Sequence, residues 1–218
     1  NLDGSINLLK AANNSYSVKN FIFASTCSNY GKMEGNRYVT EESTLKPVSL
    51  YAELKVKFEE IMLDGEYRKN FCPTALRFAT AYGISPRMRF DLTVNEFTKD
   101  AALGRELTIF GEQFWRPYCN VEDIANACIL VLESEPDKVY KNVFNVGDTR
   151  ENYQKKMLAE ELKKLIPDLK IKYVKKDEDP RDYKVSFEKI KNVLGFQITK
   201  TVPQGMEEII RVIKDNII

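Results

Sequence analysis

The chain has 218 residues, of which 43% are hydrophobic and 30% are charged, and its formal net charge is +1. This composition is typical of a soluble globular protein, and the net charge does not indicate a surface for nucleic acid or anionic membrane. No apolar run approaches the roughly 20 residues that a membrane-spanning helix needs. We therefore expect no nucleic-acid partner and no membrane partner.

The sequence contains no histidine, and its four cysteines form no Cys-x-x-Cys pair. These absences exclude His-dependent catalytic triads, His-ligated metals and zinc-type cysteine spacing. We predict no metal site, reduced thiols and a cytoplasmic protein. Any proton transfer has to use tyrosine, lysine, cysteine or carboxylate side chains.

The first predicted elements alternate between helix and strand. Apolar residues recur at helical spacing over 2–13, which predicts a helix. This segment reads as the middle of a helix, so we expect sequence upstream to be missing. The apolar run 18–26 predicts a buried parallel strand. Ser49 is a candidate N-cap for a helix that continues to about residue 68.

The same alternation continues to the end of the chain. Strands are predicted at 72–83, 106–110, 139–147 and 170–174. Helices are predicted at about 90–102, 121–134, 153–166, 186–194 and from 203 onward. This order favours an α/β fold built on a parallel sheet, with smaller elements towards the C-terminus. The charged run 175–182 is expected to be a solvated loop.

Tyr51 and Lys55 lie four residues apart in a predicted helix, so their side chains share one face. A tyrosine hydroxyl titrates at about 10, and a nearby ammonium favours the phenolate, which suits a catalytic acid or base. The same spacing also occurs on amphipathic helices whose lysine reaches for solvent. The pattern alone leaves both interpretations open.

A strand that ends in Ser25 and Thr26 precedes this pair, and parallel α/β sheets bind ligands at the carboxyl ends of strands. In this arrangement the sequence resembles the extended short-chain dehydrogenase/reductase family, the NAD(P)-dependent nucleotide-sugar epimerases and dehydratases. Thr26 stands four residues before the tyrosine of a Tyr-Gly pair, as the family's hydroxyl residue does. Tyr51 and Lys55 match the family's catalytic Tyr-x-x-x-Lys.

The resemblance extends along the chain through "NLDGSINLLKAA", "LRFATAYGISPRMRFD", "FWRPYCNVEDIANA" and "VFNVGD". It implies the C-terminal part of an NAD(P)-binding Rossmann-like parallel sheet over 1–83 and about 112–150. It also implies a smaller nucleotide-sugar-binding α/β subdomain over about 84–111 and 151–218.

The resemblance assigns a role to each matching position. Tyr51 is expected to be the acid or base at a sugar oxygen, Thr26 to hydrogen bond the same oxygen, and Lys55 to hold the nicotinamide ribose. Tyr51, Lys55 and Ser25 are the expected contacts of the cofactor, NAD or NADP. A nucleotide-diphosphate sugar is expected against Thr80, Asn95, Arg116 and Arg181. For Arg181, which lies in the charged loop, a surface ion pair is an equally good interpretation.

Four departures from the family pattern limit the interpretation. The glycine-rich GxxGxxG turn, which places a pyrophosphate on a helix N-terminus, is absent from the chain. Cys27 and Ser28 stand where the 4,6-dehydratases carry Asp-Glu, which disfavours dehydration. Cys27 is also one position away from the cysteine of the 3,5-epimerising branch, so we expect it to be a buried filler. Thr80 and Asn120 stand where many members have asparagine and histidine.

The sequence therefore predicts an NAD(P)-dependent nucleotide-sugar epimerase or 4-ketoreductase that acts through transient oxidation at C4. The alternatives are a truncated, non-catalytic binding or structural remnant and a relative of the 4,6-dehydratases. The chain by itself is expected to be inactive. By resemblance, a homodimer is expected through the helix that carries Tyr51 and Lys55.

Overall fold

The computed structural model describes residues 1–32, 35, 37–176 and 181–217. Its central element is a parallel sheet of β1 (Asn20–Thr26), β3 (Cys72–Phe78) and β7 (Asn142–Val146), in the order β1-β3-β7. Parallel neighbours need long crossover connections, and the intervening helices supply them. The predicted α/β fold with a parallel sheet is confirmed.

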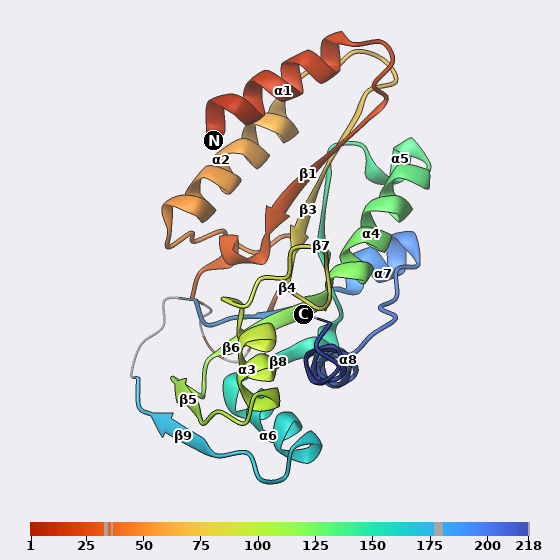
Figure 1. Cartoon of the computed structure of the whole chain (residues 1–218). Coiled ribbons are helices and arrows are strands. Elements are labelled where there is room, and N and C mark those ends of the chain that lie inside the picture. The colour runs from red at the N-terminus through yellow and green to blue at the C-terminus, as the bar shows by residue number, and fades with distance from the viewer. Residues whose placement is uncertain (33–34, 36, 177–180, 218) are drawn as a thin grey trace.

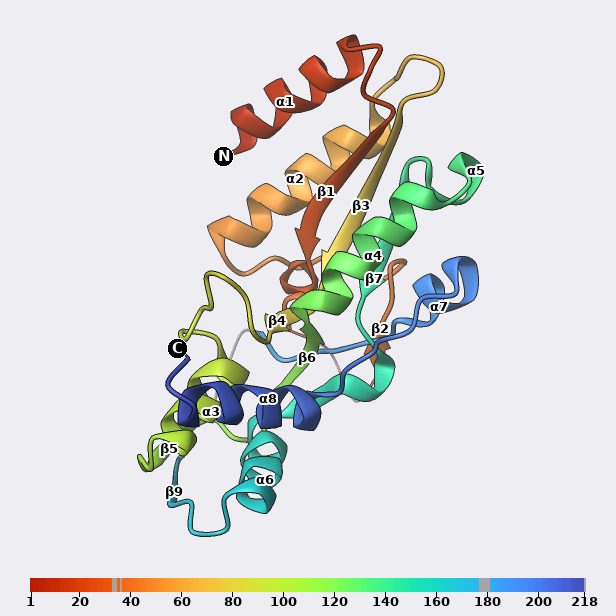
Figure 2. The same ribbon diagram turned by 45° about the vertical axis from the view of Figure 1, so that its right-hand side comes forward.

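Helices cover both faces of this sheet (Figures 1 and 2). α1 (Leu2–Asn14) and α2 (Leu50–Asp64) lie on one face, whereas α4 (Val121–Glu133), α5 (Pro136–Val139) and α7 (Glu188–Leu194) lie on the other. In β3, Ala75 packs into the cluster under α1 and α2, and the next residue, Leu76, packs into the cluster under α4 and α7. Successive strand side chains point to opposite faces, so the apolar run of β3 is buried on both.

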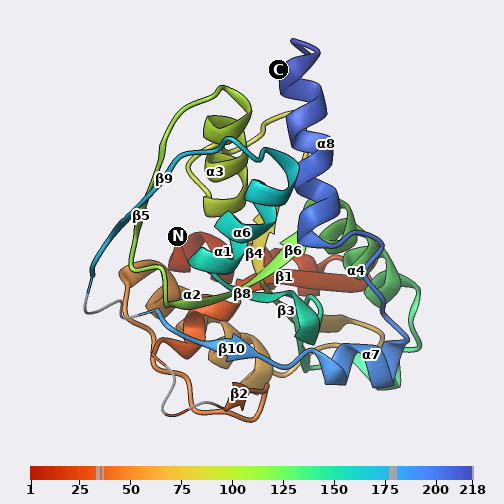
Figure 3. The same ribbon diagram turned by 90° about the horizontal axis from the view of Figure 1, so that it is seen from below.

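A second group of elements lies beyond the carboxyl ends of the central strands (Figure 3). β4 (Thr80–Tyr82) pairs parallel with β6 (Trp115–Asn120), which pairs antiparallel with β8 (Asn152–Gln154). Two further parallel pairs are β5 (Leu107–Phe110) with β9 (Ile171–Val174) and β2 (Tyr38–Val39) with β10 (Lys184–Val185). α3 (Thr93–Ala102), α6 (Lys155–Leu165) and α8 (Val202–Lys214) pack around a separate apolar core. Short 3-10 turns follow β1 and β7: η1 (Cys27–Tyr30) and η2 (Thr149–Glu151).

The predicted helices and strands are present, with some ends displaced. Ser49 is the N-cap of α2, because its hydroxyl accepts a hydrogen bond from the Ala52 N–H at 3.3 Å. The strand predicted over 72–83 is broken at Ala79 into β3 and β4, which belong to different sheets. The sequence pattern does not predict β2, β6, β8, β10 or α5. Residues 177–180 of the predicted charged loop lie outside the described residues.

The buried apolar side chains form separate clusters. Residues of 84–111 and of α6 and α8 share one core. However, Tyr183, Val185 and Ile190 pack with Leu76 and Phe144 of the central sheet. Residues 183–196 thus contribute to the Rossmann-like core, although they lie within the range expected for the smaller subdomain.

No helix among the described residues is long and apolar enough to cross a membrane.

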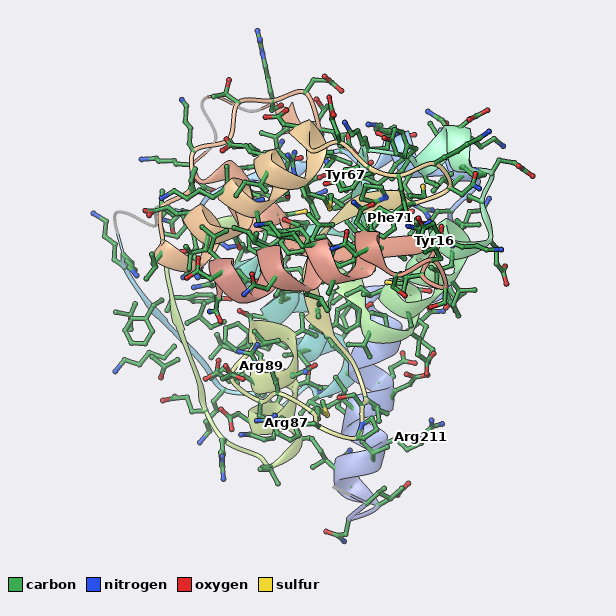
Figure 4. The ribbon with its side chains drawn as sticks, turned by 90° about the horizontal axis from the view of Figure 1, so that it is seen from above. Tyr16, Tyr67, Phe71, Arg87, Arg89 and Arg211 are labelled. Atoms are coloured by element: carbon green, nitrogen blue, oxygen red, sulfur yellow. The ribbon has the colours of Figure 1, made fainter. Side chains whose placement is uncertain are left out.

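Arg68 fixes the ends of α1 and α2 at the amino edge of the sheet. Its guanidinium donates hydrogen bonds to the carbonyl oxygens of Asn13 and Ser15, both at 2.7 Å. It also lies 5.5 Å and 5.4 Å from the ring centroids of Tyr16 and Phe71. Figure 4 shows the aromatic residues gathered at this end of α1: Tyr16, Tyr67 and Phe71. These contacts therefore join the segment that follows α2 to the C-terminal end of α1.

Candidate functional site

A cavity of about 410 Å³ opens where the carboxyl ends of β1 and β3 meet β4 and β6. This is the edge at which parallel α/β sheets bind ligands. Most of the residues expected at the site line its wall: Ser25, Thr26, Tyr51, Thr80, Arg116 and Arg181. Lys55 and Asn95 lie outside this wall. The fold thus brings together six of the eight residues singled out in the sequence.

Tyr51 and Lys55 lie on one face of α2, as their spacing predicts. Tyr51 is 56% exposed and stands at the cavity mouth. The Lys55 ammonium lies 5.6 Å from the centroid of the Tyr51 ring and donates a hydrogen bond to the Ala24 carbonyl oxygen at 2.6 Å. Burial lowers the pKa of Lys55, and the negative charge of Glu59 opposes that shift. The lysine is therefore held between helix and strand and does not extend freely into solvent.

Thr26 is the last residue of β1 and the N-cap of the turn that follows. Its hydroxyl oxygen accepts a hydrogen bond from the Ser28 N–H at 3.1 Å. This bond uses an oxygen lone pair and leaves the hydroxyl hydrogen to be donated into the cavity. Thr26 can therefore act as a hydrogen-bond donor to a bound oxygen atom.

Ser25 and Asn95 use their polar side-chain atoms within the protein. The Ser25 hydroxyl donates to a carboxylate oxygen of Glu59 and accepts from Asn29 at 3.2 Å. The Asn95 side chain accepts from the Gly83 N–H and donates to the Arg89 carbonyl, both at 3.0 Å. Asn95 thereby fixes the loop between β4 and α3. In this structure the two side chains shape the site, and the ligand contacts expected of them stay predictions.

The cavity wall contains three cationic side chains, Arg116, Arg181 and Lys155. Among the described residues of the wall there is one carboxylate, Asp91. The Asp91 carboxylate is already engaged by the Arg89 guanidinium, at 3.1 Å and 2.6 Å. The Arg116 guanidinium donates to the Trp115 carbonyl at 2.7 Å. A cluster of two guanidinium groups and an ammonium suits the oxygens of a phosphate or diphosphate.

Three lining residues lack a clear signal in the sequence. Lys155, the first residue of α6, donates to the Phe110 carbonyl oxygen at 2.8 Å. Tyr118 and Tyr183 are almost fully buried, and burial raises the pKa of each to about 12. Both phenols are therefore protonated hydrogen-bond donors at neutral pH. Tyr118 falls within the quoted "FWRPYCNVEDIANA" stretch, and that stretch could have pointed to it.

Cys27 and Ser28 have different places in the turn after β1. Cys27 is 1% exposed, and its thiol donates to the Arg77 carbonyl oxygen at 3.2 Å. Burial raises the pKa of this thiol well above its ordinary value. Ser28 lines the cavity, with its hydroxyl 3.4 Å from that of Tyr183. The geometry therefore fits the expectation that Cys27 fills space.

A smaller cavity of about 270 Å³ lies on the other side of Tyr51. Its wall includes Lys55, Phe23 and Ser5. Tyr51 lines both cavities, so its side chain separates a hydroxyl-rich, cationic space from the space next to Lys55. Two ligand groups could therefore approach the same phenol from two sides.

A parallel sheet covered on both faces, with hydroxyl and cationic side chains at its carboxyl edge, defines the class of Rossmann-like nucleotide-binding α/β proteins. Within that class the chain belongs to the NAD dependent epimerase/dehydratase family, whose model matches residues 1–147. The resemblance found in the sequence is thereby confirmed.

Similar proteins support this assignment over most of the chain. The chain is 29% identical to a UDP-glucose 4-epimerase of Lactobacillus helveticus over 219 residues, which cover 90% of this chain and 64% of the relative. The solved UDP-glucuronic acid 4-epimerase of Bacillus cereus, in complex with UDP-glucuronic acid and NAD, has a TM-score of 0.82 at 25% identity. The match covers 97% of this chain and 66% of the solved chain. The UDP-glucose 4-epimerase of Thermotoga maritima, solved with UDP-glucose, has a TM-score of 0.84 at 27% identity. That match covers 99% of this chain and 69% of the solved chain. The chain therefore spans about two thirds of the length of these relatives.

Proposed function

We propose that the protein is an NAD(P)-dependent nucleotide-sugar epimerase or 4-ketoreductase that acts at C4 of the sugar. One observation carries the proposal: a single cavity is lined by a hydroxyl donor, Thr26, a phenol, Tyr51, and the guanidinium-bearing residues Arg116 and Arg181. The hydroxyl and phenol suit proton transfer at a sugar oxygen. The guanidinium groups suit a diphosphate. The 4-epimerase activities named for the similar proteins agree with this choice.

The residues on the Lys55 side of Tyr51 fit one end of a nicotinamide cofactor. The Lys55 ammonium faces a cavity that Tyr51 also lines, so both can hydrogen bond to ribose hydroxyls. When bound, the nicotinamide supplies oxidation and re-reduction of the sugar at C4. The glycine-rich pyrophosphate turn is not in this sequence, so the fit concerns the nicotinamide end of the cofactor.

Tyr51 and Thr26 would both act on the oxygen atom at C4 of the sugar. Tyr51, as the base, accepts the proton of the C4 hydroxyl when that carbon is oxidised, and returns a proton when the keto group is reduced. Thr26 donates its hydroxyl hydrogen to the same oxygen, because its own oxygen is held by the Ser28 N–H. Lys55 lies beside this phenol, with its ammonium 5.6 Å from the centroid of the Tyr51 ring.

The cationic side chains of the cavity wall would bind the nucleotide diphosphate. Arg116 and Arg181 are the proposed phosphate contacts, and Thr80 on β4 lies in the same wall. Asn95 supports this wall indirectly by holding the loop that contains Arg89. The binding energy of the diphosphate would place the sugar at the hydroxyl-rich end, where it meets Thr26 and Tyr51.

A 4,6-dehydratase is the less favoured alternative. Such an enzyme needs an acid and a base beside the threonine to remove water from the sugar. The corresponding side chains are a buried thiol, Cys27, whose pKa is raised, and a hydroxyl, Ser28. Neither is an acid or base at neutral pH. We expect no 4-keto-6-deoxy product from dTDP- or CDP-glucose.

We further propose a homodimer through α1 and α2. Large apolar side chains on these two helices are exposed: Leu8 by 62%, Leu50 by 69% and Ile61 by 40%. Burying such side chains against a second copy would stabilise the pair. Light scattering should give twice the chain mass for the wild type and a smaller mass for Leu8→Glu combined with Ile61→Glu.

The decisive experiment measures turnover of the protein as encoded, including any sequence that precedes Asn1. UDP-, GDP-, CDP- and dTDP-sugars are screened with NAD and with NADP, first for a thermal shift and then for 4-epimerised or reduced product.

Tyr51→Phe should lower kcat by roughly 10²- to 10⁴-fold, since it removes the proton acceptor. Tyr16→Phe, which removes the hydroxyl of an exposed tyrosine just beyond the C-terminal end of α1, is the matched control. Full activity in Tyr51→Phe would overturn the proposal. Retained NAD binding without turnover on any sugar would favour the non-catalytic alternative.

A further inference from the structure

A buried carboxylate lies directly behind the site. Glu59 is on α2, four residues after Lys55 and eight after Tyr51, and it is 1% exposed. The Arg77 guanidinium from β3, itself 4% exposed, binds one of its oxygens through Nε at 3.0 Å and Nη2 at 2.7 Å. An ion pair so far from water keeps a fixed geometry, because each partner needs the other.

The other oxygen of Glu59 binds the two residues that bracket Thr26. The Ser25 hydroxyl, just before Thr26, donates to Oε1. The Asn29 side chain, in the turn just after Thr26, donates to Oε1 at 2.9 Å and to the Ser25 hydroxyl at 3.2 Å. The chain on both sides of Thr26 is therefore bound to one carboxylate on the helix that carries Tyr51.

Lys55 provides a second connection between the same two elements. Its ammonium donates to the Ala24 carbonyl, which precedes Ser25 in β1. Residues 51, 55 and 59 recur at a spacing of four and so lie on one face of α2. Figures 1 and 2 show this helix running beside β1. Two successive helical turns thus hold the end of β1, and the next turn towards the N-terminus presents the phenol.

Arg77 extends this arrangement across the sheet. Its Nη1 donates to the Tyr30 hydroxyl at 3.0 Å, and that hydroxyl donates to the Asn145 side chain on β7 at 2.7 Å. Burial raises the pKa of Tyr30, so the phenol remains a donor at neutral pH. The position of Glu59 is therefore fixed by β3, by β7 and by the turn after β1.

We propose that Glu59 is a positioning residue, and that its carboxylate sets the separation of the Thr26 hydroxyl from the Tyr51 phenol through Ser25 and Asn29. The inference rests on the proposed function, in which these two groups act on one sugar oxygen. Displacement of such groups by about 1 Å costs on the order of 10²-fold in rate. A purely structural ion pair would affect stability without changing that separation.

The carboxylate suits this task because it only accepts hydrogen bonds. Among the described residues, the groups that hydrogen bond to it are all donors: the Ser25 hydroxyl, the Asn29 amide and the Arg77 guanidinium. In Glu59→Gln an NH₂ group would meet another donor and leave Arg77 without its counterion. Loss of folding in that variant would obscure its kinetics, so the test uses changes in the two neutral partners.

The experiment compares Ser25→Ala and Asn29→Ala with Thr74→Val. Thr74 is a matched control, because it is a buried β3 hydroxyl that donates to the Val139 carbonyl at 2.8 Å and does not line the cavity. We expect kcat to fall about tenfold or more in Ser25→Ala and Asn29→Ala, with KM within about threefold. Thr74→Val should lower the melting temperature and leave both constants unchanged.

A second readout does not depend on activity. The Ser28 amide is bound to the Thr26 hydroxyl oxygen, so its hydrogen exchange reports how firmly Thr26 is held. We expect exchange at Ser28 to be at least about tenfold faster in Ser25→Ala and Asn29→Ala, and unchanged in Thr74→Val. Unchanged exchange at Ser28 with unchanged kcat would overturn the positioning role. A wild type that turns over no nucleotide sugar would overturn the proposed function, whereas the exchange experiment would still decide whether Glu59 holds Thr26.

Discussion

The Lys55 ammonium donates a 2.6 Å hydrogen bond to the carbonyl oxygen of Ala24, so the lysine of the Tyr-x-x-x-Lys pair joins α2 to the end of β1. The same ammonium lies 4.6 Å from the centroid of the Phe23 ring. Both contacts hold the charge beside the cavity that Tyr51 shares. A residue chosen for its spacing from a tyrosine is thus also a link between helix and strand.

Lys55→Met should lower kcat/KM by roughly 10²-fold or more, because it removes both the charged group beside the Tyr51 phenol and the bond to Ala24. Steady-state kinetics with the best sugar from the screen would measure this loss. Lys57→Met, on the exposed side of the same helix, serves as the control and should keep full activity. Equal activity in the two variants would contradict a catalytic role for Lys55.

Arg116→Ala should raise the KM for the nucleotide sugar by roughly 10- to 100-fold, since a hydrogen bond to a charged group contributes about 1.5–3 kcal/mol. The effect on kcat should be smaller, because the diphosphate lies away from the reacting carbon. Arg105→Ala removes an exposed guanidinium that pairs with Asp100 and should leave KM unchanged. A KM that is the same in both variants would count against diphosphate binding by Arg116.

Thiol labelling of the folded protein should modify Cys128 first and spare Cys27. Cys128 is partly exposed, whereas Cys27 is buried and its pKa is well above the ordinary value, so the reactive thiolate is scarce. Mass mapping after brief treatment with iodoacetamide at about pH 8 would show the order of reaction, and denaturant should make all four thiols reactive. Rapid labelling of Cys27 in the native state would contradict its assignment as a buried filler.

Glu41→Gln should stabilise the protein increasingly as the pH rises. Burial raises the pKa of Glu41 in the folded state, so the folded protein binds a proton more tightly than the unfolded chain does. Wild-type stability is therefore present in full at low pH and decreases as the pH rises through this raised pKa. The amide in the variant does not ionise and can still accept from the Asn145 N–H, which lies 2.7 Å from the carboxylate.

Urea unfolding of both proteins at about pH 4 and about pH 7.5 measures the difference. The free energy of unfolding of Glu41→Gln, relative to wild type, should be larger at the higher pH. Glu42→Gln changes the exposed neighbouring glutamate and should give a nearly constant difference. A constant difference for Glu41→Gln as well would contradict the assigned direction.

Much of the local structure could be predicted because it depends on neighbours in the sequence. The cap at Ser49 and the amphipathic face of α2 are set within one or two helical turns. The break at Ala79 was not predictable in this way, because the apolar run continues through it from β3 into β4. The split occurs because the later residues pair with β6, a partner far along the chain.

The sequence by itself determined the family, the alternation of helix and strand, and the identity of Thr26, Tyr51 and Lys55 as candidates, because these depend on residue type and short spacing. Tertiary structure decided which of the expected residues meet in one cavity, and it added Lys155 to the cationic wall. It also decided that Ser25 faces Glu59, a partner 34 positions away. Such pairings depend on how distant segments pack, and burial then fixes them, because a polar group removed from water must find its partner inside the protein.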